Sequence, residues 1–425
     1  MTQDISGQSR RSAFSVWQNR FSPSIRDQGR SVLLIALAVA CGWIGWCGQV
    51  LALPVAMLFP ALWACSPSRM AAAFVSAGYF LAASRGLPQG VANFYAADLW
   101  PGLLLWLAAS LAFVTVHAVV WANQSDRLTE EGRLGWRQPR RWPPLRYLLA
   151  MVLMALPPFG IVGWAQPLTA AGVVFPGWGW WGLTAATAGL LAMTTKYWPA
   201  AAIGLGGFWL WSAATWTAPA LPDRWTGVDL EMGQMLGRDA SLDHHRGMIA
   251  TAWISASKGL RFVVLPESAL GFWTPTVEHI WRDGLRGSGL VVIAGTALVD
   301  RQGYDNLMVV ISADEASILY RERMPVPVSM WQPWSRWTGQ SGGAHAHFFT
   351  NPVVEIDGEK IAPLICYEQL IVWPILQSML HTPDVIVAAS NGWWTKGTPI
   401  VEIQRASIIA WGRLFGLPVV MAFNT

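Results

Sequence analysis

The sequence contains few charged side chains and few cysteines. Charged residues make up 13% of the 425 positions, whereas 53% are apolar and 28 residues are tryptophan. A water-soluble enzyme of this length usually carries more charge, so the composition excludes a chain that is soluble throughout. Three of the four cysteines lie in apolar runs near the N-terminus, which leaves Cys366 alone in the last 205 residues. That count excludes an internal disulfide in the C-terminal part.

Acidic residues are scarce in the first half. Residues 1–220 contain 14 Lys and Arg against six Asp and Glu, whereas residues 221–425 contain 15 against 19. The sequence pI near 9.0 is therefore a property of the first half and gives no reason to expect direct nucleic acid binding. The contrast predicts two domains, a membrane domain over residues 1–220 and a water-soluble domain over residues 221–425.

Long apolar runs recur through the first half. A helix that crosses the hydrocarbon core needs about 20 mostly apolar residues. The sequence predicts seven such helices, at 31–48, 50–66, 70–84, 100–123, 147–165, 178–195 and 198–217. With a cytoplasmic N-terminus, 13 of the 14 basic residues fall on the cytoplasmic side, as the positive-inside rule requires. Seven crossings then place residues 221–425 in the periplasm, beyond the cytoplasmic (inner) membrane.

The second half alternates short β-branched runs with helical patterns, which predicts an α/β domain. Buried strands are expected at "RFVVLPES" (261–268), "GLVVIAGTALVD" (289–300), "NLMVVIS" (306–312), "KIAPLICYE" (360–368), "DVIVAAS" (384–390) and "LPVVMAFN" (417–424). Helices are expected at 241–259, 273–287, 368–381 and 399–415.

Reactive side chains stand at three strand ends, two of them among these six and the third at "ILY" (318–320). Glu267 comes after one apolar strand, Cys366 ends another, and Arg321, Glu322 and Arg323 follow a third. Reactive groups gather at the carboxyl ends of strands in α/β sheets, and a carboxylate beside a thiol can act as its general base. A lone cysteine on an apolar strand is more often a core residue, and a glutamate after Pro266 can simply cap a turn. The residues alone leave both interpretations open.

The soluble half resembles the carbon–nitrogen hydrolase (nitrilase) superfamily in several segments. "LPES" resembles the motif of the general-base glutamate, and "LICYE" resembles the nucleophile motif. "IAGTALVDRQGYDNLMVVIS", "SNGWW" and "IQRASIIAWGRLFGLPVVMAFNT" resemble other parts of the fold, in the same order along the chain. The resemblance implies a nitrilase-like αββα sandwich with Cys366 as nucleophile and Glu267 as base, and without a cofactor or metal.

Several helices followed by such a domain are similar to the apolipoprotein N-acyltransferase family. "RMPVPVSMWQPW" (323–334) is typical of a shorter branch that serves conjugal transfer of plasmids. These resemblances imply three alternatives: a conjugal-transfer membrane protein acting on an acyl or amide group through a Cys thioester, an acyltransferase of lipoprotein maturation, or an inactive binding module of the conjugation machinery. The implied partners are a membrane lipid and a lipoprotein, pilin or other conjugation protein.

The sequence departs from the family pattern at the catalytic lysine. Glu322 occupies the lysine position after Tyr320, and Met330 occupies that of a second glutamate. Arg323 is the expected substitute cation that, with backbone N–H groups, stabilises an oxyanion, although a guanidinium is broader than an ammonium. The retained Cys366 and Glu267 favour an enzyme, whereas Glu322 favours a binding module. Residues 271–275 and 329–337, including Trp331 and Trp334, are expected to line a lipid entry.

Two histidine pairs, His244 with His245 and His345 with His347, stand close in the sequence. A structural metal site needs about four ligands at suitable spacing. Neither pair has enough further ligands nearby, so we expect solvated loops at both.

Overall fold

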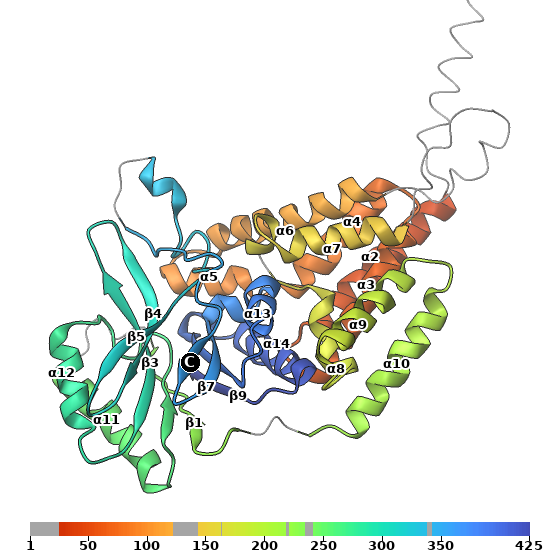
Figure 1. The fold of residues 1–425 in the computed structure, drawn as a ribbon. Coiled ribbons are helices and arrows are strands. Elements are labelled where there is room, and N and C mark those ends of the chain that lie inside the picture. The colour runs from red at the N-terminus through yellow and green to blue at the C-terminus, as the bar shows by residue number, and fades with distance from the viewer. Residues whose placement is uncertain (1–24, 122–142, 163, 218–220, 234–240, 338–341) are drawn as a thin grey trace, which may run out of the picture.

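The computed structural model describes residues 25–121, 143–162, 164–217, 221–233, 241–337 and 342–425. The described chain has a helical N-terminal half and a C-terminal half built on two β-sheets (Figure 1).

Helices make up the N-terminal half because its apolar runs are rich in Ala and Leu, which are strong helix formers. The elements are α2 (Ile25–Gly45), η1 (Val50–Leu58), α3 (Phe59–Ala64), α4 (Arg69–Ala83), α5 (Leu87–Tyr95), α6 (Leu99–Val120), α7 (Pro143–Ala155), η3 (Phe159–Ile161), η4 (Pro167–Ala170), α8 (Ala171–Val174), α9 (Gly179–Met193) and α10 (Trp198–Ala214).

Each of the seven predicted membrane segments contains a helix, but most of these helices are short. In the described part of the chain, two helices are long and apolar enough to cross a membrane, Asp27–Gly45 and Leu99–Val120. A third candidate is the pair α4 and α5, which is bent by 49°. The seven-span topology therefore stays a prediction, and α5 is a helix that the sequence patterns did not indicate.

Two sheets form the centre of the C-terminal half. The first has the order β1 (Trp225–Gly227), β2 (Phe262–Val264), β3 (Val291–Val299), β4 (Tyr304–Ile311) and β5 (Ala316–Arg321). The second has the order β6 (Val354–Ile356), β7 (Glu359–Ile365), β8 (Val385–Asn391) and β9 (Val419–Asn424). Strands β1 to β3 pair in parallel, as do β7 to β9, while β4, β5 and β6 pair antiparallel to their neighbours.

The sheets pack face to face with helices on both outer sides. Alternation along β2 shows the layers: Phe262 and Val264 face the second sheet, whereas Val263 packs under α11 (Leu242–Ser257) and α12 (Pro275–Gly284). On the other side, α13 (Val372–Met379) and α14 (Ile400–Phe415) cover the second sheet (Figure 1). The predicted nitrilase-like αββα sandwich is confirmed, together with the six expected strands, the strand at "ILY" (β5) and the four helices; β1 and β6 were not predicted.

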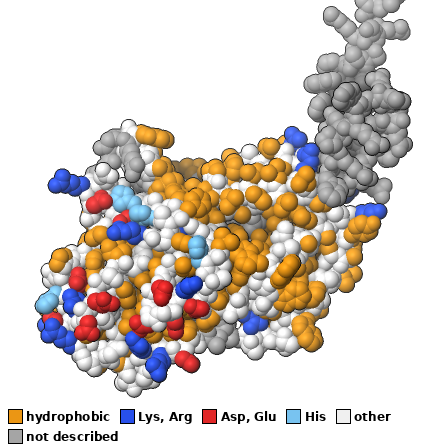
Figure 2. All heavy atoms as spheres, in the orientation of Figure 1, with side chains coloured by type: hydrophobic (Ala, Val, Ile, Leu, Met, Phe, Trp, Pro, Cys, Tyr) orange, Lys and Arg blue, Asp and Glu red, His pale blue; other side chains and the backbone are white. Residues whose placement is uncertain are grey.

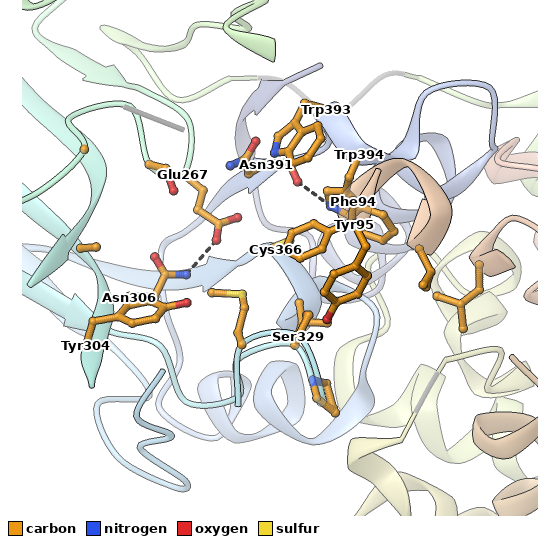
Figure 3. A pocket seen from close by; sticks show the side chains of 18 of the residues that line it. Phe94, Tyr95, Glu267, Tyr304, Asn306, Ser329, Cys366, Asn391, Trp393 and Trp394 are labelled. Atoms are coloured by element: carbon orange, nitrogen blue, oxygen red, sulfur yellow. Dashed lines mark hydrogen bonds between the residues drawn. The ribbon is translucent and has the colours of Figure 1, made fainter. Parts of the chain in front are cut away.

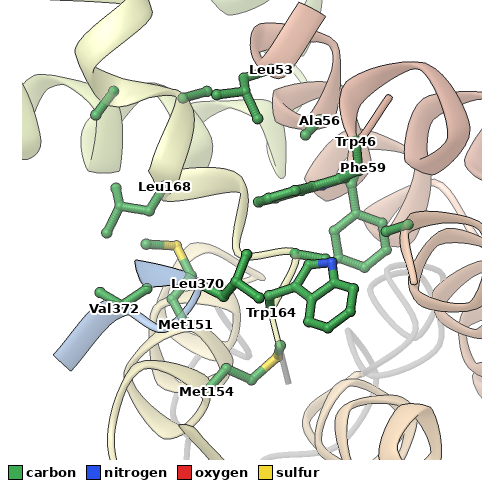
Figure 4. Close-up of a cluster of buried hydrophobic side chains, with 14 of the residues drawn as sticks. Trp46, Leu53, Ala56, Phe59, Met151, Met154, Trp164, Leu168, Leu370 and Val372 are labelled. Carbon is green, nitrogen blue, oxygen red and sulfur yellow. The ribbon is translucent and has the colours of Figure 1, made fainter. Parts of the chain in front are cut away.

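The outer helices of the second sheet are buried against the N-terminal half. Leu370 and Val372 belong to one apolar cluster with Met151, Trp164 and Leu168 (Figure 4). The Tyr367 hydroxyl, at the end of β7, donates to the Ile161 carbonyl at 3.1 Å. The two halves therefore share a core, and the strand that ends at Cys366 is held directly against the N-terminal helices.

The surface of the helical half differs from that of the sandwich in its side-chain types. Figure 2 shows hydrophobic side chains gathered over the helical half and most charged ones over the sandwich. On α6, Trp100 and Leu104 are 61% and 58% exposed. Such a surface on the helical half is expected where helices contact lipid.

Candidate active site

Cys366 sits at a sharp turn between β7 and η7 (Cys366–Gln369). Its φ is 42°, in the left-handed region that costs a non-glycine residue about 1–3 kcal/mol. The turn is fixed from α14, where the Gln404 amide donates to the Cys366 carbonyl at 3.2 Å. The side chain is 4% exposed. A strained, braced conformation at a strand end indicates that this cysteine does more than fill the core.

Glu267 approaches Cys366 from the other sheet, in the turn that follows β2. This turn crosses β3 very closely, because a Cβ on Gly295 would lie 2.4 Å from the Glu267 Cα. Burial raises the pKa of Glu267 to about 7, although the hydrogen bond from Asn306 opposes the rise. The structure thus brings together the predicted nucleophile and the predicted base.

Asn306 on β4 links Glu267 to a second carboxyl group. Its amide nitrogen lies 2.8 Å from Oε1 of Glu267 and 2.7 Å from Oε2 of Glu322, so it donates one hydrogen to each. Glu322 is fully buried, and burial followed by the charges of Glu267 and Glu368 holds its pKa well above the ordinary range. The position of the family's lysine is therefore filled by an acid that shares a donor with the base.

The surroundings of Cys366 favour the protonated thiol over the thiolate. Burial raises the pKa of Cys366 well above its usual value, and the charges of Glu267 and Glu322 raise it further. Because the thiolate is the reactive form of cysteine, deprotonation has to accompany attack. Glu267 is the group placed to accept that proton.

Arg323 does not reach this site. Its Nε donates to the Tyr320 hydroxyl at 2.9 Å and lies 3.6 Å from Glu368 Oε1. Its terminal nitrogens donate into α13, to the Pro374 carbonyl and to the Gln377 and Ser378 side chains. The expected role of Arg323 in stabilising an oxyanion does not fit this geometry, because its guanidinium is the buried counter-ion of Glu368 and ties β5 to α13.

A cavity of about 170 Å³ opens beside Cys366 and Glu267. Its polar lining includes Ser268, Asn306, Ser329 and Asn391, and aromatic rings form much of the remaining wall (Figure 3). Those rings belong to Phe94, Tyr95, Phe272, Tyr304, Trp393 and Trp394.

Helix α5 supplies one side of the cavity from the N-terminal half. Phe94 stacks on Trp393 with ring centroids 5.8 Å apart. Asn93 donates to the carbonyls of Trp394 and Lys396 at 2.9 and 3.0 Å. Gly90 allows this contact, since a Cβ there would lie 2.5 Å from the Trp394 ring. Helix and active-site loop are therefore packed as one unit.

Some residues of the two segments expected to line a lipid entry lie at the cavity. Gly271, Phe272, Ser329 and Met330 line the cavity, so each expected segment contributes to it. Trp331 and Trp334 are not among the described lining residues. Trp331 instead packs against Phe348, with ring centroids 5.5 Å apart.

The histidine pairs have other partners. His345 contacts Asp300 at 3.0 Å and His347 contacts Asp305 at 2.7 Å. The expected solvated loop is wrong for His244 and His245, which lie in helix α11. His245 is buried and accepts from the Trp281 indole at 3.2 Å, and His244 contacts the Ala269 carbonyl. No group of three or more metal-binding side chains occurs within the described ranges.

The sequence patterns missed the contribution of α5 and the bridging role of Asn306. "SNGWW" (390–394) was expected only as part of the fold. The structure shows that it begins at the end of β8, which is parallel to β7, and that Asn391, Trp393 and Trp394 line the cavity. Nothing in "LPQGVANFY" indicates that it walls a cavity.

Residues 81–413 match the family model described as carbon–nitrogen hydrolase. The chain belongs to the carbon–nitrogen hydrolase family. Among curated relatives of this family member, "Conjugal transfer protein TraB" of Agrobacterium fabrum is 66% identical over the full length of both chains. "Probable conjugal transfer protein TraB" of Sinorhizobium fredii is 59% identical over 94% of this chain and all of its own. The predicted resemblance to the conjugal-transfer branch is confirmed.

Solved structures of family members are more distant. An amidase from Nesterenkonia has 11% sequence identity and a TM-score of 0.36, over 47% of this chain and 75% of the amidase. A second amidase structure from Nesterenkonia gives the same TM-score at 10% identity. Similarity at this level adds nothing to the assignment, which rests on the family match and the full-length relatives.

Proposed function

We propose that the chain is a conjugal-transfer protein of the inner membrane whose carbon–nitrogen hydrolase site transfers an acyl group through Cys366. The names of the two full-length relatives support the role in conjugal transfer. The observation that carries the chemistry is the strained Cys366 turn, which shares a largely apolar cavity with Glu267.

In the proposed reaction, the Cys366 sulfur attacks the carbonyl carbon of an ester or amide while its proton passes to Glu267. The C–O or C–N bond then breaks, Glu267 returns the proton to the leaving oxygen or nitrogen, and a thioester remains on Cys366. An amine attacks the thioester, loses a proton through Glu267 and departs with the acyl group, which regenerates the thiol. A base with a pKa of about 7 suits both transfers, because it is found in either protonation state near neutral pH.

The proposed location is a multi-pass arrangement with a cytoplasmic N-terminus and a periplasmic sandwich. Two span-length apolar helices and the exposed apolar side chains of α6 support a membrane position. The cavity is walled partly by α5 and by Leu105 of α6, which suits an acyl donor taken from the lipid. The acceptor amine then belongs to a lipoprotein, a pilin or another protein of the conjugation machinery.

Glu322 favours a second candidate, a binding module that has lost catalysis. A buried acid raises the pKa of the neighbouring thiol, where a lysine ammonium in the same place would lower it. In that case Cys366 and Glu267 serve to hold a ligand rather than to transform it.

Replacement of Cys366 by Ser tests the two candidates, because it removes the reactive thiol with little change in volume. If Cys366 is the nucleophile, plasmid transfer falls to the level of a deletion while membrane expression is retained. The wild-type protein then also carries a hydroxylamine-sensitive acyl adduct on Cys366, detectable by mass spectrometry. Cys65→Ser is the matched control, since Cys65 lies in the N-terminal half away from the cavity.

Transfer at the wild-type level with Cys366→Ser would contradict the catalytic proposal and leave the binding module. Rescue of a strain depleted of its apolipoprotein N-acyltransferase would instead assign the chain to general lipoprotein maturation.

A further inference from the structure

The charged side chains that line the Cys366 cavity are all acidic among the described residues. Glu267 lines it directly, and no Lys, Arg or His is found among the described lining residues. Six aromatic residues line the same space, among them Tyr95, Tyr304 and Trp393 (Figure 3). Aromatic faces attract cations through their negative quadrupole and are the usual walls of sites for alkylammonium groups.

Glu267 and Glu322 are both buried, and each carboxyl group is only partly hydrogen-bonded. Because Asn306 donates to both, the two accepting oxygens lie no more than 5.5 Å apart, the sum of the two distances. The other oxygens, Oε2 of Glu267 and Oε1 of Glu322, are buried without a hydrogen-bond partner. Two carboxylates this close cannot both ionise in a dry site unless a positive charge joins them. The pair therefore gains stability from a cation brought into the cavity.

We infer that the Cys366 cavity binds the ammonium group of a membrane-borne amphiphile, between the aromatic rings and the Glu267–Glu322 pair. This inference rests on the proposed function in one respect, that the cavity beside Cys366 is the substrate site. It adds the charge of the substrate, because an anionic head would meet the carboxyl group of Glu267, with Glu322 behind it across Asn306 and no Lys, Arg or His among the described lining residues.

The surface around the cavity favours an amphiphile over a soluble amine. Leu87 and Val91 of α5 and Leu105 of α6 line the same cavity. On α6, the neighbouring Leu104 is exposed on one of the two span-length helices. A ligand with an apolar tail therefore has a continuous apolar surface along which to reach the site.

The charge preference can be measured at the Cys366 sulfur without any turnover. The full chain, with Cys41→Ala, Cys47→Ser and Cys65→Ser, is purified in a neutral maltoside detergent. Cys366 is then modified by methanethiosulfonates that carry a trimethylammonium, a methyl or a sulfonate end. In each reaction the cysteine thiolate displaces a sulfinate and forms a mixed disulfide, so the chemistry is the same and the charge alone differs.

We expect the cationic reagent to react about tenfold faster than the anionic one, after normalisation to a small free thiol. Glu322→Gln reduces this ratio, and Glu322→Lys reverses it. Glu315→Lys is the matched control, because it makes the same charge change on the exposed β4–β5 turn and should leave the ratio unchanged. Equal normalised rates, or a ratio that Glu322→Lys does not alter in a protein with unchanged melting, overturn the inference.

Protection of Cys366 identifies the source of the ammonium group. Decyltrimethylammonium is expected to slow modification by the neutral reagent, whereas decyl sulfate is not. Choline should protect better than 3,3-dimethylbutanol, its uncharged analogue of the same shape. If a short peptide with a free amino terminus protects and the amphiphile does not, the membrane-borne source is wrong. If the cationic reagent reacts faster than the anionic one but Cys366→Ser supports wild-type plasmid transfer, the cavity binds an ammonium group and the proposed catalysis is wrong.

Discussion

At the scale of single residues, four buried acidic or thiol groups decide the chemistry. These four groups are all buried, and they belong to Glu267, Glu322, Glu368 and Cys366. Glu368 has Arg323 as a counter-ion and accepts from the Tyr320 hydroxyl at 2.7 Å. Glu267 and Glu322 have a neutral amide instead. Arg323 therefore stabilises the fold, and no Lys or Arg lies among the described residues that line the cavity.

The raised pKa of Glu267 predicts a pH-dependent stability. Since its folded pKa is about 7 and its ordinary value is 4.5, the folded state holds this proton over a range in which the unfolded state has lost it. The free energy of unfolding therefore falls as pH rises from about 4.5 to 7. The variant Glu267→Gln keeps an acceptor for Asn306 but has no proton to lose, so this fall in the free energy of unfolding is absent from it.

We expect the melting temperature of Glu267→Gln to exceed that of the wild type increasingly from pH 4.5 to 7.5, through a gain of about 1–3 kcal/mol. Melting followed by intrinsic tryptophan fluorescence measures the difference. Glu315→Gln on the exposed β4–β5 turn serves as control, with a difference that is constant across this range. A Glu267→Gln difference that shrinks as pH rises would mean that Glu267 is stabilised as a carboxylate.

At the scale of elements, α5 joins the N-terminal half to the active-site loop. Its contact with η8 (Trp393–Thr395) depends on Gly90, on the Phe94–Trp393 stack and on the Asn93 hydrogen bonds. Trp393 and Trp394 follow β8, next to the strand of the nucleophile. A change on α5 therefore acts on the cavity although it lies far from Cys366 in the sequence.

Gly90→Ala tests this coupling. The added methyl group would lie 2.5 Å from the Trp394 ring, so either the ring or α5 must move, at a cost of about 1–3 kcal/mol. We expect a lower melting temperature and altered labelling of Cys366. Gly204→Ala in α10 is the matched control, because nothing lies within 4 Å of its added Cβ. Equal melting and labelling in the two variants would show that α5 does not brace the loop.

At the scale of the whole molecule, the sandwich and the helical half cannot be separated without exposing a common core. The apolar cluster of α13 and α14 continues into the N-terminal helices (Figure 4). The cavity is likewise built from both halves. A sandwich expressed without residues 25–217 would expose that cluster to water.

The proposed topology predicts opposite results for fusions at two positions. Alkaline phosphatase joined after Thr425 should be active, because this enzyme matures outside the cytoplasm. A fluorescent protein at the same position should be dark, and one joined after Trp121 should be bright, because Trp121 lies at the cytoplasmic end of the fourth proposed span. A bright fluorescent protein after Thr425 would place the sandwich in the cytoplasm and contradict the seven-span proposal.

Local periodicity, which is readable along the chain, was enough to predict an α/β domain and six of its strands. The αββα sandwich and the roles of Cys366 and Glu267 were implied by the family resemblance, because these two residues follow strands of different sheets and no rule for a single sheet brings them together. Tertiary structure alone decided where Arg323 points, that Asn306 bridges Glu267 to Glu322, and that α5 walls the cavity. The direction of a long side chain and the contacts of a distant helix depend on which elements are packed together, and neighbours in the sequence do not determine that.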